Sequence, residues 1–484
     1  MKDAFSKRYP VPCTPSTSDL GGRTKRGRED DEEGVMDQSV PEQQTNEKVE
    51  VTENQMDTSP AEPSEQKKVK SKNEVESTKV SPVRNSLNFP IPNSQGHGVI
   101  VKLYDVEEGA LKLNDCVEFI GIVSLDPLLA QNGSKNVDEF MQPEIEAKNP
   151  PPSLILRLHV LKFQKLIHNN PHLGQDPASM VCWEEIRRCR DELHALLTPL
   201  LFGDAVAAEY MICHLMSQIY TRKDSLCLGK STLNLFSVPN NYAKRLFTIL
   251  QLLLTKSHHL PLSIENLNSH TFVPKKDYNI NRLESGILQL SSGTHLLIDE
   301  TVMNNGQLNP EGVKNLTAIG QVIKFQSLPY DFGYHNLSFD TDIPCCILSE
   351  GRSILPFDFQ LLLKPQVEMT EDTLSNIFTQ AGKNLDVEQL NRLRNYLTSA
   401  KSMHFELTEE AQNFVQEDFV QQRQNTNADI KTSEDLHSLL VLARLICLSR
   451  GEKSLNPSIW NEAKNLEKER KQRSAHLPTR AQQM

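Results

Sequence analysis

The chain changes in composition near Asn88, and only the part after that residue is apolar enough to fold. Before it, Ser, Thr, Glu, Gln, Lys and Pro prevail and aliphatic residues stand alone. Burying so little apolar surface cannot offset the entropy lost on folding, so residues 1–88 are predicted to be a long disordered segment. A chain of 484 residues is long enough for two or three domains.

Two short basic clusters interrupt this segment, and three of its hydroxyl residues precede proline. The clusters consist of Lys25, Arg26 and Arg28, and of Lys67, Lys68 and Lys70. Such clusters are typical of nuclear-import signals, which would bring an importin as partner and a nuclear location, but also of weak anion patches or plain solvated charge. Thr14, Ser59 and Ser81 are candidate phosphorylation sites for proline-directed kinases, although such dipeptides also occur by chance.

Overall composition limits the function classes. A net charge of -11 and 6% aromatic residues argue against a generally basic nucleic-acid binder. Nine cysteines without a Cys-x-x-Cys pair indicate neither a disulfide framework nor a zinc site, and a reducing compartment, cytosol or nucleus, follows. Adjacent Cys345 and Cys346 are expected in the core. No apolar run approaches the roughly 18 residues of a membrane span, and no signal peptide is recognised.

The first pattern after the linker is β. Apolar and polar residues alternate over residues 99–104 and 115–123, which predicts two strands that must join a larger sheet. After a proline-rich break the pattern becomes helical, over residues 153–167, 184–201 and 204–220, with Asp204 as the expected N-cap of the last helix.

A Gly-Lys-Ser triplet begins at Gly229, but it is not a good phosphate-binding loop. The glycine required five positions earlier is replaced by Asp224, and the triplet leads into an alternating strand rather than a helix. The order strand, turn, helix occurs next, at residues 232–253. That turn has no glycine, and Arg245 stands where a magnesium-ligating Ser or Thr would follow Lys244.

This order, followed by "SGILQLSSGTHLLIDET" and "DIPCCILSEGRSILPFD", is similar to the core of the MCM (mini-chromosome maintenance) replicative helicases, which are AAA+ ATPases. Residues 393–424 and 428–451 resemble their helical lid, and "LKLNDCVEFIGIVS" resembles a strand of their OB-fold domain. The resemblance implies an α/β fold: 89–150 OB-like, 151–370 a degenerate AAA+-like core, 371–466 a lid, and 467–484 a basic disordered tail.

The nucleotide-handling positions depart from the helicase pattern. The resemblance places the lysine of the phosphate loop at Lys244, the sensor asparagine at Ser349 and the lid's sensor arginine at Glu434, and an arginine-finger motif has no counterpart. Asp299 and Glu300 alone keep their type, and they are interpreted as two solvated acids at a strand end. Phosphoryl transfer depends on positioning and charge stabilisation, so the pattern predicts a helicase-like body that is not an enzyme and takes no cofactor.

A second resemblance fits this description. The segments "LLFGDAVAAEY", "YTRKDSLCLGK", "SEGRSILP" and "EDLHSLLVLAR" are similar to those of the MCM-binding proteins, degenerate relatives of the helicases. The family implies binding of MCM subunits, assembly, chaperoning or unloading of their complex in DNA replication, and a link to sister-chromatid cohesion. Family members carry a further folded region before the linker, and this chain is expected to lack it.

Two alternative functions remain open from the sequence. An active MCM-like ATPase would need the missing glycines. A DNA-binding accessory protein would need a basic face, and the basic stretches are the linker clusters and residues 468–473, so direct nucleic-acid binding is not expected. In the lid, the apolar residues of one helix are expected in the core: Leu436, Leu439, Leu440, Ala443 and Ile446.

If the two basic clusters act as import signals, neutralising all six of their lysines and arginines should leave the protein in the cytoplasm. The reason is that importin recognition depends on the positive charge itself. Fluorescence microscopy of tagged wild-type and neutralised chains provides the measurement. Unchanged nuclear accumulation would show that the clusters are solvated charge, or that import depends on a bound partner.

Overall fold

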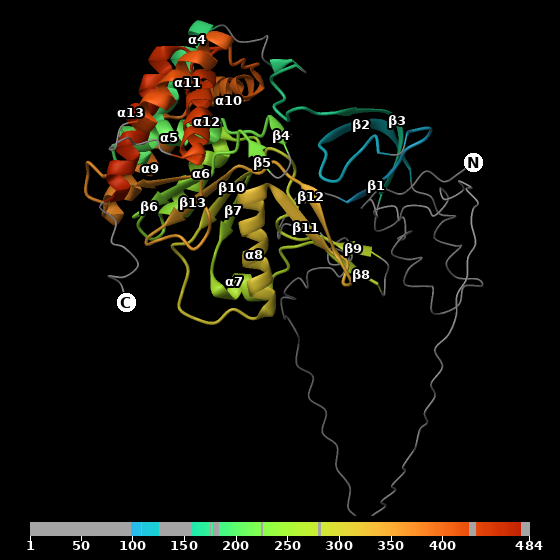
Figure 1. Ribbon diagram of the computed structural model, residues 1–484. Coiled ribbons are helices and arrows are strands. Elements are labelled where there is room, and N and C mark those ends of the chain that lie inside the picture. The colour runs from blue at the N-terminus through green and yellow to red at the C-terminus, as the bar shows by residue number, and fades with distance from the viewer. Residues whose placement is uncertain are drawn as a thin grey trace, which may run out of the picture. The chain divides into compact units, whose positions relative to one another are not determined.

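The computed structural model describes residues 98–107, 109–124, 156–174, 176–177, 183–223, 226–278, 282–424 and 432–475 (Figure 1). The candidate import and phosphorylation residues, all before residue 98, lie outside these ranges. Within them the fold is mixed α/β, as predicted, with several sheets and a group of C-terminal helices.

The first sheet has three strands in the order β1-β3-β2. The two predicted strands are confirmed as β1 (Val99–Lys102) and β2 (Val117–Ser124). The helix predicted over residues 153–167 was wrong, because this segment forms β3 (Leu156–Lys165), parallel to β1 and antiparallel to β2. Its apolar residues also fit an alternating pattern, and two strands alone are only marginally stable, so pairing on both sides decides in favour of a strand.

The main sheet has five parallel strands in the order β14-β6-β13-β10-β7. All five residues of β10 and of β13 are buried, as expected for central strands covered on both faces. Cys345 and Cys346 are accordingly core residues, which confirms the prediction. The strands are β6 (Leu233–Phe236), β7 (Ser257–Pro261), β10 (His295–Asp299), β13 (Cys345–Ser349) and β14 (Phe359–Leu362).

Side chains alternate between two cores on the two faces of this sheet. Leu297 and Leu348 pack into a core with the helices that precede and follow the sheet, whereas Ile298 and Ile347 pack on the opposite side against α7 (Ile264–Ser269) and α8 (Pro310–Phe325). The first core contains α4 (Trp183–Leu200), α5 (Ala205–Leu215), α6 (Tyr242–Leu253), α9 (Glu371–Asn384), α10 (Val387–Ser402), α11 (Glu409–Gln424), α12 (Ser433–Ser449) and α13 (Pro457–Ala475). The disordered tail predicted from residue 467 was wrong as far as Ala475, because α13 continues to that residue and buries Glu467 and Arg473.

The smaller elements complete the body. A four-stranded sheet has the order β12-β11-β8-β9, and β4 pairs with β5. These strands are β4 (Thr221–Lys223), β5 (Leu226–Leu228), β8 (Lys275–Asp277), β9 (Arg282–Glu284), β11 (Ser327–Asp331) and β12 (Asn336–Asp340). In the described ranges, no helix is long and apolar enough to cross a membrane.

The helix α12 begins and packs as its sequence indicates. Thr432 and Asp435 form a reciprocal capping box at its first turn. Leu439, Ala443 and Ile446 are buried. The other two predicted core residues, Leu436 and Leu440, are only partly buried but pack against the same core.

Asp204 joins three separate segments through its buried carboxylate. It is the N-cap of α5, as predicted, because Oδ1 accepts from Val206 N and Ala207 N, each at 3.1 Å. Its other oxygen, Oδ2, accepts from Lys364 N at 2.9 Å, just after β14, and from Arg473 Nη1 in α13 at 2.6 Å. The side chains of Asp204 and Arg473 are 2% and 5% exposed, so this ion pair lies in the interior.

Asp204→Ala removes both the helix cap and the buried counterion of Arg473. We expect the free energy of unfolding to fall by about 3–5 kcal/mol, because the helix cap is lost and the buried arginine keeps only the half-exposed carboxylate of Glu469 as a counterion. Glu469→Ala is the matched control, since Glu469 pairs with the same arginine but is 46% exposed. It should cost at most about 1 kcal/mol. Urea unfolding of the three proteins gives the comparison, and equal losses would contradict a special role for Asp204.

Candidate functional site

Apart from Glu434, the positions assigned by the helicase resemblance meet at the edge formed by the carboxyl ends of β6, β13 and β10. The Val238 N–H, in the turn after β6, donates to the carbonyl of Ser349 at 3.2 Å. The Glu300 N–H donates to the carbonyl of Leu348 at 2.9 Å. The turn, Ser349 and the two acids are therefore neighbours at one edge of the sheet, where ligands of open α/β sheets bind.

The turn between β6 and α6 is held by packing instead of glycine. Ser237 and Asn241 adopt left-handed backbone angles, with φ of 67° and 64°. Tyr242 opens α6 fully buried, its ring stacked on Phe202 at 5.4 Å between centroids and its hydroxyl donating to the carbonyl of Leu200 at 2.9 Å. The first turn of this helix is thus committed to the core.

The two basic residues of this helix face outward. Lys244 is exposed, and no described side chain forms an ion pair with it. Arg245 pairs with Glu371 in the first turn of α9, which joins α6 to the lid. Arg245 therefore has a structural partner where a helicase would place a magnesium ligand.

Asp299 is buried, which corrects the expectation of a solvated acid. It is 4% exposed, and its Oδ1 accepts from Thr301 N at 3.0 Å and Thr301 Oγ1 at 2.6 Å. Its Oδ2 lies 3.6 Å from His259 Nε2, an ion-pair distance but longer than a hydrogen bond. Burial acts to raise the pKa of Asp299, but the contacts with His259 and Thr301 outweigh it and hold the pKa below its usual value.

Glu300 and Ser349 are also engaged by neighbouring side chains. Ser353 Oγ donates to Glu300 Oε1 at 2.9 Å, and burial raises the pKa of Glu300. Ser349 is 2% exposed and its hydroxyl donates to Asn234 Oδ1 in β6 at 3.0 Å. Glu300 is half-buried, so neither acid is the free, solvated group that the sequence predicted.

The Gly-Lys-Ser triplet has a structural explanation. Gly229 has φ of +99°, and a Cβ there would lie 2.3 Å from the carbonyl oxygen of Gln218, so only glycine fits. Lys230 pairs with Asp358, whose other oxygen accepts from Thr232 N at 2.8 Å. The strand predicted after the triplet is confirmed as β6.

Glu434 lies apart from the other assigned positions. It is exposed in the first turn of α12, beside Asp435, which pairs with Lys471 at 2.8 Å. Among the described contacts, none joins Glu434 to Lys244 or to Asp299. Within the described ranges, no group of three or more His, Cys, Asp or Glu side chains is placed to hold a metal ion.

Several side-chain partners were missed from the sequence. At the carboxyl edge, His259 and Asn234 contact Asp299 and Ser349 from neighbouring strands. At the opposite edge, before β6 and β14, Asp358 neutralises Lys230 from 128 residues away. Asn234 alone had a local signal, a polar residue between two leucines of a buried strand. The remaining pairs depend on strand order, which the sequence does not state.

Comparison with known proteins identifies the family. A family profile described as "Mini-chromosome maintenance replisome factor" matches residues 2–474. The chain belongs to this family. It is 41% identical over 405 residues to the mini-chromosome maintenance complex-binding protein of Salmo salar, which covers 80% of this chain and 64% of that protein. The corresponding protein of Homo sapiens is 40% identical over 410 residues, covering 80% and 63%.

A third relative extends the match. The mini-chromosome maintenance complex-binding protein of Danio rerio is 36% identical over 485 residues, covering 96% of this chain and 75% of that protein. The matched chain spans less than two thirds of the salmon and human relatives. The resemblance to MCM-binding proteins seen in the sequence is confirmed.

The engaged side chains lead to a prediction about nucleotide. We expect the purified protein neither to hydrolyse Mg-ATP nor to bind it tightly at the edge beside Lys244, because the turn has no glycine and both acids are held by internal partners. Calorimetry with Mg-ATP on wild type and Lys244→Ala gives the measurement. Binding with a Kd of about 1 μM that disappears in Lys244→Ala would contradict the prediction.

Proposed function

We propose that this chain binds MCM helicase subunits through a helicase-like body that does not use ATP. The observation that carries the proposal is the edge formed by β6, β13 and β10. Except for Glu434, it brings together the positions that the helicase resemblance assigns to nucleotide, yet Asp299, Glu300 and Ser349 each have a partner within the fold. Relatives with 36–41% identity are named as complex-binding proteins.

The architecture supports the finer part of this proposal. We infer that the main sheet and the helices that flank it form a degenerate AAA+-like core within residues 151–370, and that α9 to α13 form its helical lid. The sheet of β1, β3 and β2 is inferred to be the OB-like segment, which extends the sequence-based boundary at residue 150 to include β3. The five parallel strands, the glycine-free turn before α6 and the lid helices packed on one face of the sheet support this inference. Such a body offers MCM subunits a surface like that of one of their own neighbours.

The cellular role follows from the same family. We propose that binding regulates DNA replication by assembling, chaperoning or unloading the MCM complex, with a link to sister-chromatid cohesion. The protein would act in the nucleus after import by an importin, and it would need neither a cofactor nor direct contact with DNA. Crosslinking the chain to separate MCM subunits tests the central claim, and the absence of crosslinks to every subunit would reject it.

Glu434 provides a test of where the subunits dock. It is exposed in the first turn of α12, so Glu434→Arg should change the free energy of unfolding by about 0.5 kcal/mol or less. If MCM subunits dock on the lid as they dock on each other, the reversed charge should weaken association by about tenfold through repulsion of a basic partner. Pull-down of purified MCM subunits by the wild-type and variant proteins measures the effect.

Glu388→Arg is the matched control. Glu388 is an exposed acid in the first turn of another lid helix, α10. Glu388→Arg changes the net charge by the same amount as Glu434→Arg. A non-specific effect of charge would therefore weaken the association of both variants with MCM subunits alike. Unaltered pull-down by a folded Glu434→Arg protein would show that the start of α12 is not in the docking face.

A further inference from the structure

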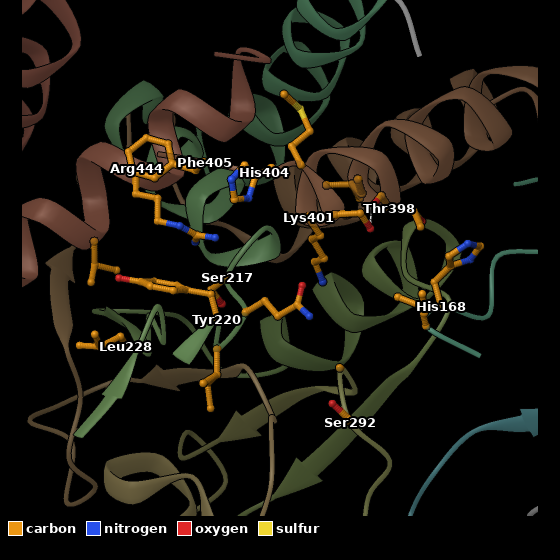
Figure 2. Close-up of a pocket in the computed structure, with 18 of the residues that line it drawn as sticks. His168, Ser217, Tyr220, Leu228, Ser292, Thr398, Lys401, His404, Phe405 and Arg444 are labelled. Carbon is orange, nitrogen blue, oxygen red and sulfur yellow. Dashed lines mark hydrogen bonds between the residues drawn. The ribbon is translucent and has the colours of Figure 1, made fainter. Parts of the chain in front are cut away.

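A cavity of about 860 Å³ lies at the other edge of the main sheet, away from Asp299. Lys256 and Gly293, which line it, come just before the amino ends of β7 and β10. The opposite wall consists of the C-terminal part of α10 and the middle of α12, so the cavity lies between the sheet and the lid (Figure 2). Its volume is in the range of small-molecule sites, about 300–1,000 Å³.

Four cationic side chains line this cavity, in a chain whose net charge is -11. They are Lys256, Lys401, Arg394 and Arg444. Across the described residues, no carboxylate oxygen lies within ion-pair distance of any of the four. Asp176 is the one acid in the described lining. Asp342, which is partly buried nearby, acts on Lys401 and Lys256 through its charge without lying within ion-pair distance of either. Four cations against this one acid and Asp176 leave the cavity with an excess of positive charge.

Their polar partners within the protein are uncharged. Lys256 donates to the carbonyl of Ser292. Lys401 Nζ lies 2.7 Å from His295 Nε2, and Arg394 Nε donates to the carbonyl of Leu252 at 2.7 Å. These contacts fix the directions of the cations without cancelling their charge.

Of the four cations, Arg444 gives the clearest indication of an anion-binding site. It is 9% exposed, its guanidinium lies 4.3 Å from the centre of the Tyr220 ring, and its Nη1 has no hydrogen-bond partner. Figure 2 shows Arg444 and Lys401 extending from two lid helices into the same space. A buried cation with an unused donor is costly unless a ligand satisfies it, which makes Arg444 a ready contact for an anion.

We propose that this cavity binds a small multivalent anion that carries phosphate or carboxylate groups. Guanidinium and ammonium groups from separate segments converge on the cavity, and these are the groups that recognise such oxygens. The apolar side chains of Leu397, Leu440 and Val441 in the same lining accommodate a carbon frame. The site is separate from the edge beside Lys244 and does not depend on the binding of MCM subunits.

The environment of Lys401 gives this site a pH dependence. Burial lowers the pKa of Lys401 to about 8. Asp342 counteracts this effect, Lys256 adds to it, and both His295 and His214 lie nearby with lowered pKa values because they are buried. A bound anion stabilises the charged amine and raises its pKa. Binding near pH 8 should therefore take up protons, and affinity should fall as the pH rises through 8.

The test uses calorimetry of the full chain with three probes of different span, pyrophosphate, citrate and myo-inositol hexakisphosphate. At least one should bind with a stoichiometry of one to one. Lys401→Gln should weaken that binding by about tenfold or more, because it removes a charged hydrogen bond. Lys244→Gln, an exposed cation at the opposite edge, is the matched control and should change the Kd by less than about twofold at roughly 100 mM ionic strength.

Each other outcome rejects the site. Failure of all three probes to bind below about 1 mM would overturn the proposal. Equal weakening by Lys401→Gln and Lys244→Gln would indicate non-specific charge attraction. Binding of an acidic peptide without any of the small anions would assign the cavity to a protein segment instead. If Lys401→Gln fails to fold by its thermal midpoint, Arg394→Gln replaces it with the same expected loss.

Proton uptake is measured by repeating the titration at pH 8 in two buffers of different ionisation enthalpy. A difference between the two apparent binding enthalpies that corresponds to proton uptake supports the role of Lys401. Equal enthalpies in the two buffers contradict it. Unchanged pull-down of MCM subunits by Lys401→Gln would leave the proposed function intact, whichever result the anions give.

Discussion

The buried ion pair between Asp204 and Arg473 connects the lid to the body of the fold. One carboxylate caps α5, accepts from the backbone after β14 and neutralises an arginine of α13, so three segments share one acceptor group. Two charges in the interior are stable only when they are paired and hydrogen-bonded. The position of α13 is thereby fixed against the edge strand of the main sheet, where Arg470 also donates to the carbonyl of Gln360 at 3.0 Å.

With the lid fixed, the two edges of the main sheet acquire different properties. At the carboxyl edge, polar side chains pair with one another, as Asp299 does with Thr301 and Ser349 with Asn234. At the amino edge, cations from α10 and α12 face a cavity, and among the described residues no carboxylate lies within ion-pair distance of them. The edge that resembles a nucleotide site is satisfied internally, and the edge without such a resemblance holds unused donors.

Local features of the sequence predicted local structure well. Asp204 was recognised as a cap because a capping side chain bonds to amides two or three residues away. The predicted order of strand, turn and helix over β6 and α6 was correct for a similar reason, since turn and helix signals are short in range. The strand β3 was missed because its apolar residues fit two periods, and the pairing that decides between them involves strands far away in the chain.

The candidate site was less predictable, because its properties depend on partners distant in sequence. Asp299 was expected in solvent as the last residue of a strand, yet His259 from the next strand and Phe247, stacked on that histidine, cover it. The same applies to Arg444, because its proposed role as an anion contact depends on its position over the Tyr220 ring and on Lys401 across the cavity. A residue type indicates what chemistry is available, but only the tertiary contacts decide whether that chemistry is used within the fold or remains free for a ligand. In this chain, the acids of the helicase pattern are used within the fold, and the free groups are cations at the opposite edge.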